Sequence, residues 1–488
     1  MRSFLTEGQQ ADSLSGQVRA FLRSFGDLLR LPRAFWYINV AFLLDNMAYF
    51  GMLTLMTTYL STDMAWGDKP AAITVSLFTG FVTLFMLGVG SYAEGFGLRR
   101  ALLFALFISV AGRALYSYGY EVPGALNAIL AVFGGLMIVA VGAGISQPVC
   151  YSGIKQYTDE KTNAMGYGLL YAFMNLGMVI VGALSAWVRP GVDRLLATDL
   201  TPDRPLDSLL LPLARATESG VQAVNWVCTG ISAFAFVWFG LFMTRRAEAA
   251  KIRPDTAQEN RQRNSASIPR RMISYFTEGP FTNARFLFFI FMLLPVRTLF
   301  AHQWLTFPQY VLRAYPQAVA NRMEWIVEWI NPLIIFIGVP IATALTRHVH
   351  VYRAMMIGTL VSAAPTFLLV PGPHLGLLIA YFVIFSIGEC LWSARFYEYA
   401  SEIAPPGRIA QYMGLATVPW FLAKTTTGLY SGAVLEKFCP QNVPAEQMQT
   451  QWMWTLYGSI ALATPIGLWL GRRWAMKDLQ TGPRVPSA

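Results

Sequence analysis

The sequence predicts an all-α integral membrane protein with twelve transmembrane helices in two six-helix bundles. Hydrophobic residues make up 55% of the 488 residues, charged residues only 13%, and the mean hydropathy is +0.44. A soluble protein carries about 25% charged residues, so this composition leaves too little polar surface for one. The chain also contains about twelve apolar windows of the roughly 20 residues that a helix needs to cross a bilayer.

The expected helices follow these windows in chain order, and a polar linker separates the first six from the last six. The windows of the first half cover residues 35–61, 71–93, 101–120, 125–151, 164–188 and 221–244. Those of the second half cover residues 285–311, 324–346, 352–370, 375–398, 408–435 and 450–472. The expected domains are an amphipathic cytoplasmic segment, a bundle, a cytoplasmic linker, a second bundle and a cytoplasmic tail, at residues 1–34, 35–245, 246–283, 284–473 and 474–488.

The charge pattern predicts how the chain lies in the membrane. Arginines gather on the side that carries the amino terminus, whereas the loops of the opposite side mix both signs. By the positive-inside rule, both termini are expected in the cytoplasm and the chain in the inner membrane. The same rule accounts for the net charge of +10, so no nucleic-acid partner is expected. No cleavable signal peptide is expected, because the first thirty or so residues lack an apolar stretch. The four cysteines are scattered without metal-type spacing, so neither a metal nor a cofactor is expected.

The loop after the second window reads "GSYAEGFGLRR" and has a weak counterpart, "GVPIATALTRHVHVYR", after the eighth window. Its glycines permit a tight turn, and its charged residues can tie the loop to a helix end. The loop resembles the signature between the second and third helices of the major facilitator superfamily, with Glu94 where that family usually has aspartate. The resemblance implies the major facilitator fold and a gating loop formed by Gly90, Glu94, Gly97, Arg99 and Arg100.

Four further segments are similar to the proton-coupled oligopeptide transporter family, and they occur in the expected order. They read "DNMAYFG" from Asp45, "LLYAFMNLG" from Leu169, "WINPLIIFIGVP" from Trp329 and "IGECLWSARFYEYASEIAPPGRIAQYMGL" from Ile387. The family's first-helix motif carries two glutamates and an arginine, linked to proton coupling and to binding of the substrate carboxylate. This chain has Phe42, Asp45 and Asn46 at those positions, and Gln147 replaces the family's fourth-helix lysine. The resemblance therefore implies a divergent member of the family.

Ionisable residues near the middle of the expected helices are candidates for function, because each must find a partner or a wet cavity. They are Asp45, Arg113, Arg297, Glu389 and Lys424. Asp45 either forms a structural pair with Arg113 or faces a central cavity as a proton site or a substrate contact. Glu389 and Lys424 form either a salt bridge that opens during transport or a permanent structural pair. Three cations against two acids favour an anionic or zwitterionic solute, held by charge-assisted hydrogen bonds.

The sequence thus predicts a secondary active transporter rather than an enzyme. It would move a small zwitterionic or anionic solute, peptide-like or amino-acid-derived, by proton-coupled alternating access between two repeated halves. Asp45 and Glu389 are the expected proton-coupling residues. The expected substrate-binding residues are Tyr49, Gln147, Tyr171, Asn175, Arg297, Trp304, Asn331, Glu389, Trp392 and Lys424.

Two other functions are compatible with the same pattern. One is a proton-antiport exporter of amphiphilic or drug-like compounds, which the aromatic content of 14% would suit. The other is a ligand sensor that has a transporter fold but transports nothing. In each case the expected partners are a small solute, protons and membrane lipids, and the chain is expected to be a monomer.

Overall fold

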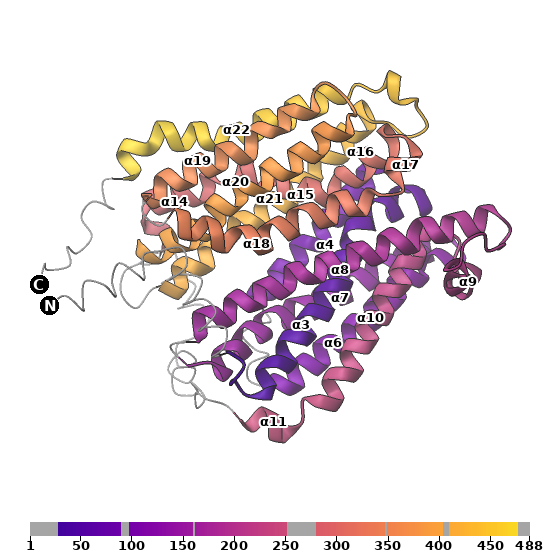
Figure 1. Ribbon diagram of the computed structural model, residues 1–488, viewed down its shortest axis with the longest axis horizontal. Helices are drawn as coiled ribbons and strands as arrows, with labels where there is room; N and C mark the ends of the chain where they lie inside the picture. The colour runs from indigo at the N-terminus through magenta and orange to yellow at the C-terminus, as the bar shows by residue number, and fades with distance from the viewer. Residues whose placement is uncertain are drawn as a thin grey trace, which may run out of the picture.

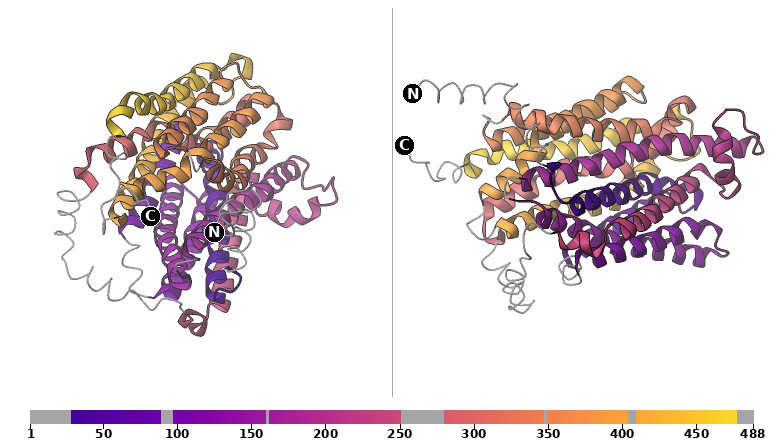
Figure 2. Two further views of the ribbon diagram at one scale, coloured as in Figure 1. Left: turned by 60° about the vertical axis from the view of Figure 1, so that its left-hand side comes forward. Right: turned by 60° about the horizontal axis from the view of Figure 1, so that its bottom comes forward.

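A computed structural model describes residues 28–88, 97–159, 162–250, 280–346, 349–403 and 409–476. These residues form helices and connecting turns, and no strand occurs in the part described. The helices assemble into two bundles, indigo to magenta for the first half of the chain and salmon to yellow for the second (Figure 1). Both views in Figure 2 show the two bundles lying alongside each other. The predicted all-α fold, with twelve spanning helices in two six-helix bundles, is confirmed.

The first bundle contains six long helices. They are α3 (Arg33–Thr58, continued by a π-helical turn, η1, Tyr59–Asp63), α4 (Asp68–Gly88), α6 (Leu98–Tyr118), α7 (Ala125–Tyr157), α8 (Asn163–Ala197) and α10 (Gly220–Phe242). Three short elements join or extend them: η3 (Gly119–Glu121), α9 (Asp207–Arg215) and α11 (Arg245–Ala249). The α9 helix is held to α8 by Arg194, whose Nη2 donates to Asp207 Oδ1 over 2.7 Å and lowers the pKa of that carboxyl.

The second bundle also spans six times, but two of its spans are interrupted. The seventh span consists of α14 (Ala284–Met292), α15 (Leu294–Leu305) and α16 (Phe307–Ala314), and the eighth of a π-helical turn, η5 (Trp325–Trp329), and α18 (Ile330–Leu345). The others are α19 (Val351–Ala363) with η6 (Ala364–Leu369), α20 (Leu375–Glu402), α21 (Ile409–Phe438) and α22 (Thr450–Ala475). The short connecting elements are η4 (Pro280–Thr282), α17 (Gln317–Ala320) and η7 (Ala445–Gln447). Of the helices described, ten are long and apolar enough to span a membrane, and α18 and α21 complete the twelve.

Two helices differ from the windows expected for them. The window for the fifth span ends at residue 188, but α8 continues to Ala197 with Pro190 inside it. The seventh window divides at Leu293, two residues before Pro295, because proline cannot donate the backbone hydrogen bond of a helix. Thr464 of α22 bonds to backbone groups on both sides of this break. Its hydroxyl donates to Met292 O over 2.7 Å and accepts from Val296 N over 3.0 Å. Neighbouring side chains commonly satisfy backbone groups that proline frees within a membrane.

Large apolar side chains on the outside of the bundles agree with a membrane environment. Leu126, Leu241 and Leu470 are each about two-thirds exposed, at 68%, 69% and 68%. In water such a surface would drive association, whereas lipid tails solvate it. The polar and charged side chains discussed below are instead turned inward.

The bundles meet along two seams. In the α4–α21 seam, α4 packs against α21, and in the α8–η5 seam, α8 packs against η5 and α18. Between the seams, α3 contacts α15 and α16. Many of the hydrogen bonds between the bundles gather at one end, which contains Asp68, Arg189 and Arg313 and is called the closed end below. The opposite end, where α3 begins and α22 finishes, lies to the left in Figure 1.

Candidate functional site

Asp45 of α3 lies in a polar cluster inside the first bundle. Arg113 of α6 approaches Asp45 Oδ1 to 3.2 Å through Nη1 and to 3.3 Å through Nη2. Ser146 of α7 donates to the other carboxylate oxygen over 2.8 Å, and Ser232 of α10 accepts from Arg113 over 2.6 Å. Arg113 is 1% exposed and Asp45 4%. The cluster joins four helices of one bundle. This arrangement agrees with the alternative in which Asp45 and Arg113 form a structural pair.

Next to this cluster, the two amides at the family's cationic positions bond to each other. Gln147 Nε2 donates to Asn46 Oδ1 over 3.2 Å, and Asn46 Nδ2 donates to the Phe42 carbonyl over 2.7 Å. Two cations at these positions would repel each other, whereas two amides form a hydrogen bond without any charge. These positions are therefore neutral, with Asn46 buried and Gln147 partly exposed.

The other residues expected in the first bundle are less available to a ligand. Asn175 donates through Nδ2 to the Tyr171 carbonyl of its own helix over 2.9 Å. Tyr49 is 8% exposed and its ring packs against Phe50 and Phe78. Tyr171 is 37% exposed, so it is the most accessible of the three.

In the second bundle, Arg297 is enclosed by aromatic rings. Its guanidinium carbon lies 4.3 Å from the ring centre of Phe396, 5.4 Å from that of Trp420 and 5.7 Å from that of Trp392. The Trp392 indole in turn donates to Ser362 Oγ over 3.2 Å. Cation–π contacts of this kind stabilise a desolvated cation by about 2 kcal/mol or more. Arg297 is 1% exposed, so the structure does not place it at an accessible binding surface as expected.

Lys424 of α21 differs from Arg297 because it is only half-buried. Its ammonium lies 5.7 Å from the ring centre of Trp304 and 5.4 Å from that of Trp420. Trp420 therefore contacts both Lys424 and Arg297. Within the part of the chain that is described, Lys424 forms no ion pair.

Glu389 of α20 bonds to a neutral partner instead of Lys424. Asn331 of α18 donates through Nδ2 to Glu389 Oε2 over 2.8 Å and to Ser386 Oγ over 3.0 Å. Glu389 and Lys424 form no ion pair here, so the salt bridge expected between them is absent from this conformation of the described residues. Glu389 is 7% exposed and Asn331 6%. The result is a carboxyl inside a spanning helix with an amide as its hydrogen-bond donor.

The gating loop is described only from Gly97 onward, and Gly90 and Glu94 lie outside the described residues. Gly97 has φ +85°, a conformation that favours glycine and begins α6. Arg99 donates through its backbone N to Glu248 Oε1 over 3.0 Å and through Nε to the Met243 carbonyl. Together with Arg100 and Arg245, these residues line a cleft of about 280 Å³. The start of α6 is thus tied to α11, the element that follows the sixth span.

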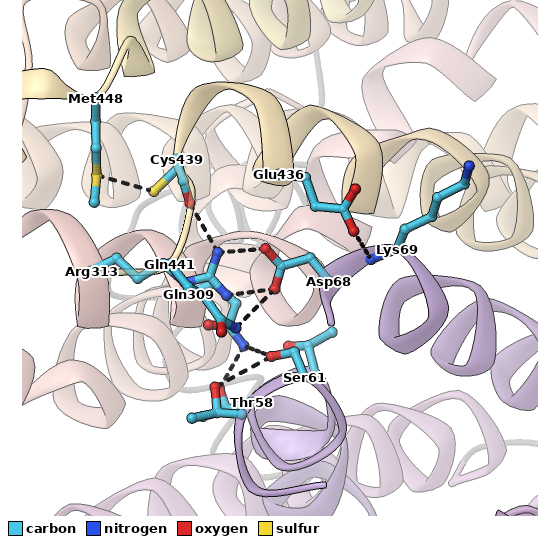
Figure 3. Close-up of polar contacts among 12 residues, drawn as sticks. Thr58, Ser61, Asp68, Lys69, Gln309, Arg313, Glu436, Cys439, Gln441 and Met448 are labelled. Carbon is cyan, nitrogen blue, oxygen red and sulfur yellow. Dashed lines mark hydrogen bonds and ion pairs between the residues drawn. The ribbon is translucent and has the colours of Figure 1, made fainter. Parts of the chain in front are cut away.

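Two buried ion pairs between the bundles were not predicted from the sequence. Arg313 donates to both oxygens of Asp68, over 2.5 and 2.6 Å, and to the Cys439 carbonyl over 2.9 Å (Figure 3). Arg189 of α8 pairs with both oxygens of Glu324. Their side chains are at most 8% exposed. The available signal was weak, because all four residues lie at the ends of apolar windows, where charges usually face water or lipid headgroups.

The chain resembles membrane transporters in sequence and in fold. Among curated proteins, "Peptide transporter family 1" of Drosophila melanogaster is 25% identical over 165 residues, which are 32% of this chain and only 22% of that protein. A solved POT family transporter in complex with 5-aminolevulinic acid has a TM-score of 0.63 at 16% identity and covers 91% of this chain and 97% of its own. A POT family transporter crystallised in meso has a TM-score of 0.66 at 16% identity, with coverage of 92% and 99%. The family model described as Major Facilitator Superfamily matches residues 41–425. Because that match extends over most of the sequence, the chain belongs to the Major Facilitator Superfamily.

Proposed function

We propose that the chain is a proton-coupled secondary active transporter of a small zwitterionic or anionic, peptide-like solute in the inner membrane. The observation that carries this proposal is the Glu389 carboxyl, which lies inside a spanning helix and accepts a hydrogen bond from the neutral amide of Asn331. Ionisable residues within a membrane are usually functional, and carboxyls without a fixed counter-charge serve as proton relays in transporters. Asp45, by contrast, is held by Arg113, so Glu389 is the better candidate for proton coupling.

Lys424 is the proposed anchor for the negative end of the solute. Arg113 is paired with Asp45 and Arg297 is enclosed by three rings, whereas the half-buried Lys424 lies over two aromatic rings and forms no ion pair among the described residues. A solute carboxylate can replace these cation–π contacts with a stronger charge-assisted hydrogen bond. Gln147 on the other bundle, which is partly exposed and bonded to the buried Asn46, suits the uncharged part of the solute. Solved neighbours crystallised with 5-aminolevulinic acid and with a thioalcohol-conjugated peptide support a peptide-like substrate.

Alternating access is the proposed mechanism, with the closed end facing outward. The positive-inside rule assigns the opposite end to the cytoplasm. The ion pairs Asp68–Arg313 and Arg189–Glu324 join the bundles at the closed end, so they must separate before a solute can enter there. Rocking of one bundle against the other around a central site is the usual motion of such folds.

The test is uptake into proteoliposomes with an imposed inward pH gradient, using dipeptides, amino acids and 5-aminolevulinic acid as candidate solutes. We expect Glu389→Gln to lower gradient-driven accumulation more than counterflow exchange, because exchange needs no net proton movement. Glu446→Gln, which changes an exposed acid outside the spans, is the control and leaves both rates unchanged. Equal loss of both modes in Glu389→Gln would reject a proton role. Efflux of amphiphilic drugs in place of uptake would favour the exporter, and no movement of any solute would favour the sensor.

A further inference from the structure

Glu328 is a buried carboxyl in the α8–η5 seam to which neither the sequence pattern nor the proposed mechanism assigns a role. It lies on η5 of the second bundle and is 3% exposed. It faces Gly182 of α8 in the first bundle. A Cβ atom placed on Gly182 would lie 2.8 Å from Glu328 Cβ and 2.9 Å from Oε2. The glycine therefore lets the carboxyl press directly against the other bundle.

The surroundings of this carboxyl contain little that would stabilise a negative charge. Within the described part of the chain, neither carboxyl oxygen has a hydrogen-bond partner. The hydroxyl of Thr54 on α3 lies near the carboxyl, and α10 contributes the thiol of Cys228. The charged groups that act on Glu328 are Arg189 of α8 and Glu324, one turn earlier on its own segment. α20 also packs against η5 and adds no further charged group among the residues described.

Arg189 acts on Glu328 only at a distance, because its donors are directed to other groups, and Nη1 lies 3.9 Å from Asp193 Oδ2. Its Nε and Nη2 both pair with Glu324, and Nη2 also donates to the Ala320 carbonyl over 2.8 Å. An ionised Glu328 would therefore be a buried charge whose only nearby hydrogen-bond donor among the described residues is the Thr54 hydroxyl, and it would be repelled by the carboxylate of Glu324. Buried charges occur in proteins only when they are paired or hydrogen-bonded. A protonated Glu328 has no net charge and can donate its O–H to the nearby Thr54 hydroxyl after a rotation of its side chain.

We propose that Glu328 is a proton-binding site that links protonation to closure of the α8–η5 seam. While the seam is closed, the carboxyl holds its proton. When the bundles separate, water reaches the carboxyl, the proton passes to that water, and a hydrated carboxylate remains. Closure then requires the reverse step, in which the carboxylate takes up a proton. The link to transport rests on the proposed function, but the protonated state in the closed seam does not.

Infrared difference spectroscopy of the full chain in lipid nanodiscs tests the protonated state without any transport assay. We expect the spectrum of the native protein minus that of Glu328→Gln to show the carbonyl stretch of a protonated carboxylic acid. Glu446→Gln is the control, since it removes an exposed carboxylate outside the spans and leaves the seam unchanged. That difference should show a carboxylate band instead. An acid band that persists unchanged in Glu328→Gln, or a carboxylate band in its place, overturns the proposal.

A second variant covers the case in which Glu328→Gln does not fold. A site that holds a neutral carboxyl should also accept Glu328→Met, which is neutral and of similar length. If neither variant folds, Glu328 is held as an ion and the proposal fails. If the acid band is present but no solute is transported, the proton site stands and the proposed function fails, so the two results are distinguishable.

The link to closure is measured by the distance between spin labels on the two bundles. Leu209 of α9 and Ala318 of α17 are exposed on different bundles, and the four native cysteines are buried. For one linked proton, the ratio of closed to open molecules should fall by up to about tenfold for each unit of rising pH. In Glu328→Gln this ratio should not change with pH. The same pH dependence in both proteins would overturn the link.

Discussion

The two seams perform the same task with different chemistry. Each has a buried pair of arginine and carboxylate at the closed end, Asp68–Arg313 beside the α4–α21 seam and Arg189–Glu324 in the α8–η5 seam. Asp68 begins α4 and Arg313 lies in the last turn of α16, so each charge is also favoured by the dipole of its own helix. Gln441 adds a hydrogen bond to Asp68 over 3.4 Å (Figure 3).

Farther from the closed end, the two seams differ in the contacts between their helices. In the α4–α21 seam, glycine allows the helices to touch: a Cβ on Gly428 would lie 2.6 Å from the Ala72 carbonyl, and Ser76 donates to the Lys424 carbonyl over 3.1 Å. In the α8–η5 seam, the corresponding contact is the Glu328 carboxyl against Gly182. The first seam is therefore closed by packing that does not change with pH. The second is closed by a group whose charge can change, so one seam can respond to protons while the other serves as a fixed contact.

The largest expected effect comes from breaking the pair in the α8–η5 seam. Glu324→Gln leaves Arg189 as a buried charge without its partner, and such a change costs about 3–5 kcal/mol of stability. The double change Arg189→Gln, Glu324→Gln removes both charges and should recover most of that loss. Asp68→Asn should cost less, because Arg313 lies in the last turn of α16, where the helix dipole favours a positive charge. Thermal unfolding of the purified variants checks this order of stability losses. If the losses from Arg189→Gln and Glu324→Gln simply add in the double variant, the two residues do not form a stabilising pair.

The next effect tests the packing of the α4–α21 seam. A Cβ on Gly428 would lie 1.5 Å from Ser76 Oγ and 2.6 Å from the Ala72 carbonyl. Gly428→Ala should therefore destabilise the closed conformation by about 1–3 kcal/mol, as overpacking usually does. Gly230→Ala on α10 is the matched control, because nothing lies within 4 Å of its Cβ position. Label distances and melting temperature should change in the first variant and not in the second. An unchanged closed population in Gly428→Ala would show that this seam is not held by close packing.

The fold was predictable because hydrophobic windows of spanning length occur twelve times, and length and composition are enough to identify a spanning helix. Depth in the membrane was also predictable, which is why Asp45 and Arg113 were recognised as a candidate pair. The rotation of each helix about its own axis could not be predicted from the sequence. Glu389 and Lys424 lie at similar depth, but the side chain that turns toward Glu389 is Asn331. The windows alone do not say which face of each helix meets which neighbour.

Charges at the ends of windows were the other failure of prediction. The fifth window ends one residue before Arg189, and the eighth begins at Glu324, so the windows give no indication that either residue is buried. The structure continues α8 through Pro190 and places Arg189 against Glu324 in a buried seam. Glu328 lies inside the eighth window, four residues after Glu324, but the window does not show that this position faces the other bundle. A charge at a window's end faces water in an isolated helix, but it can be buried where two bundles meet.

The smallest expected effect concerns a bond that belongs to neither seam. Thr57 of α3 donates through Oγ1 to the Trp304 carbonyl of α15 over 2.9 Å. Four residues later α16 has Pro308, which has no N–H, so a continued helix could not satisfy that carbonyl. Thr57→Val removes the donor at nearly constant volume and should cost about 1 kcal/mol, as the loss of one buried hydrogen bond does. Thr57→Ser keeps the hydroxyl and is the control. Since α3 and α15 meet between the seams, the loss should loosen both equally, and label pairs placed across each seam should report the same shift. A shift confined to one seam would mean that the contact between α3 and α15 supports that seam alone.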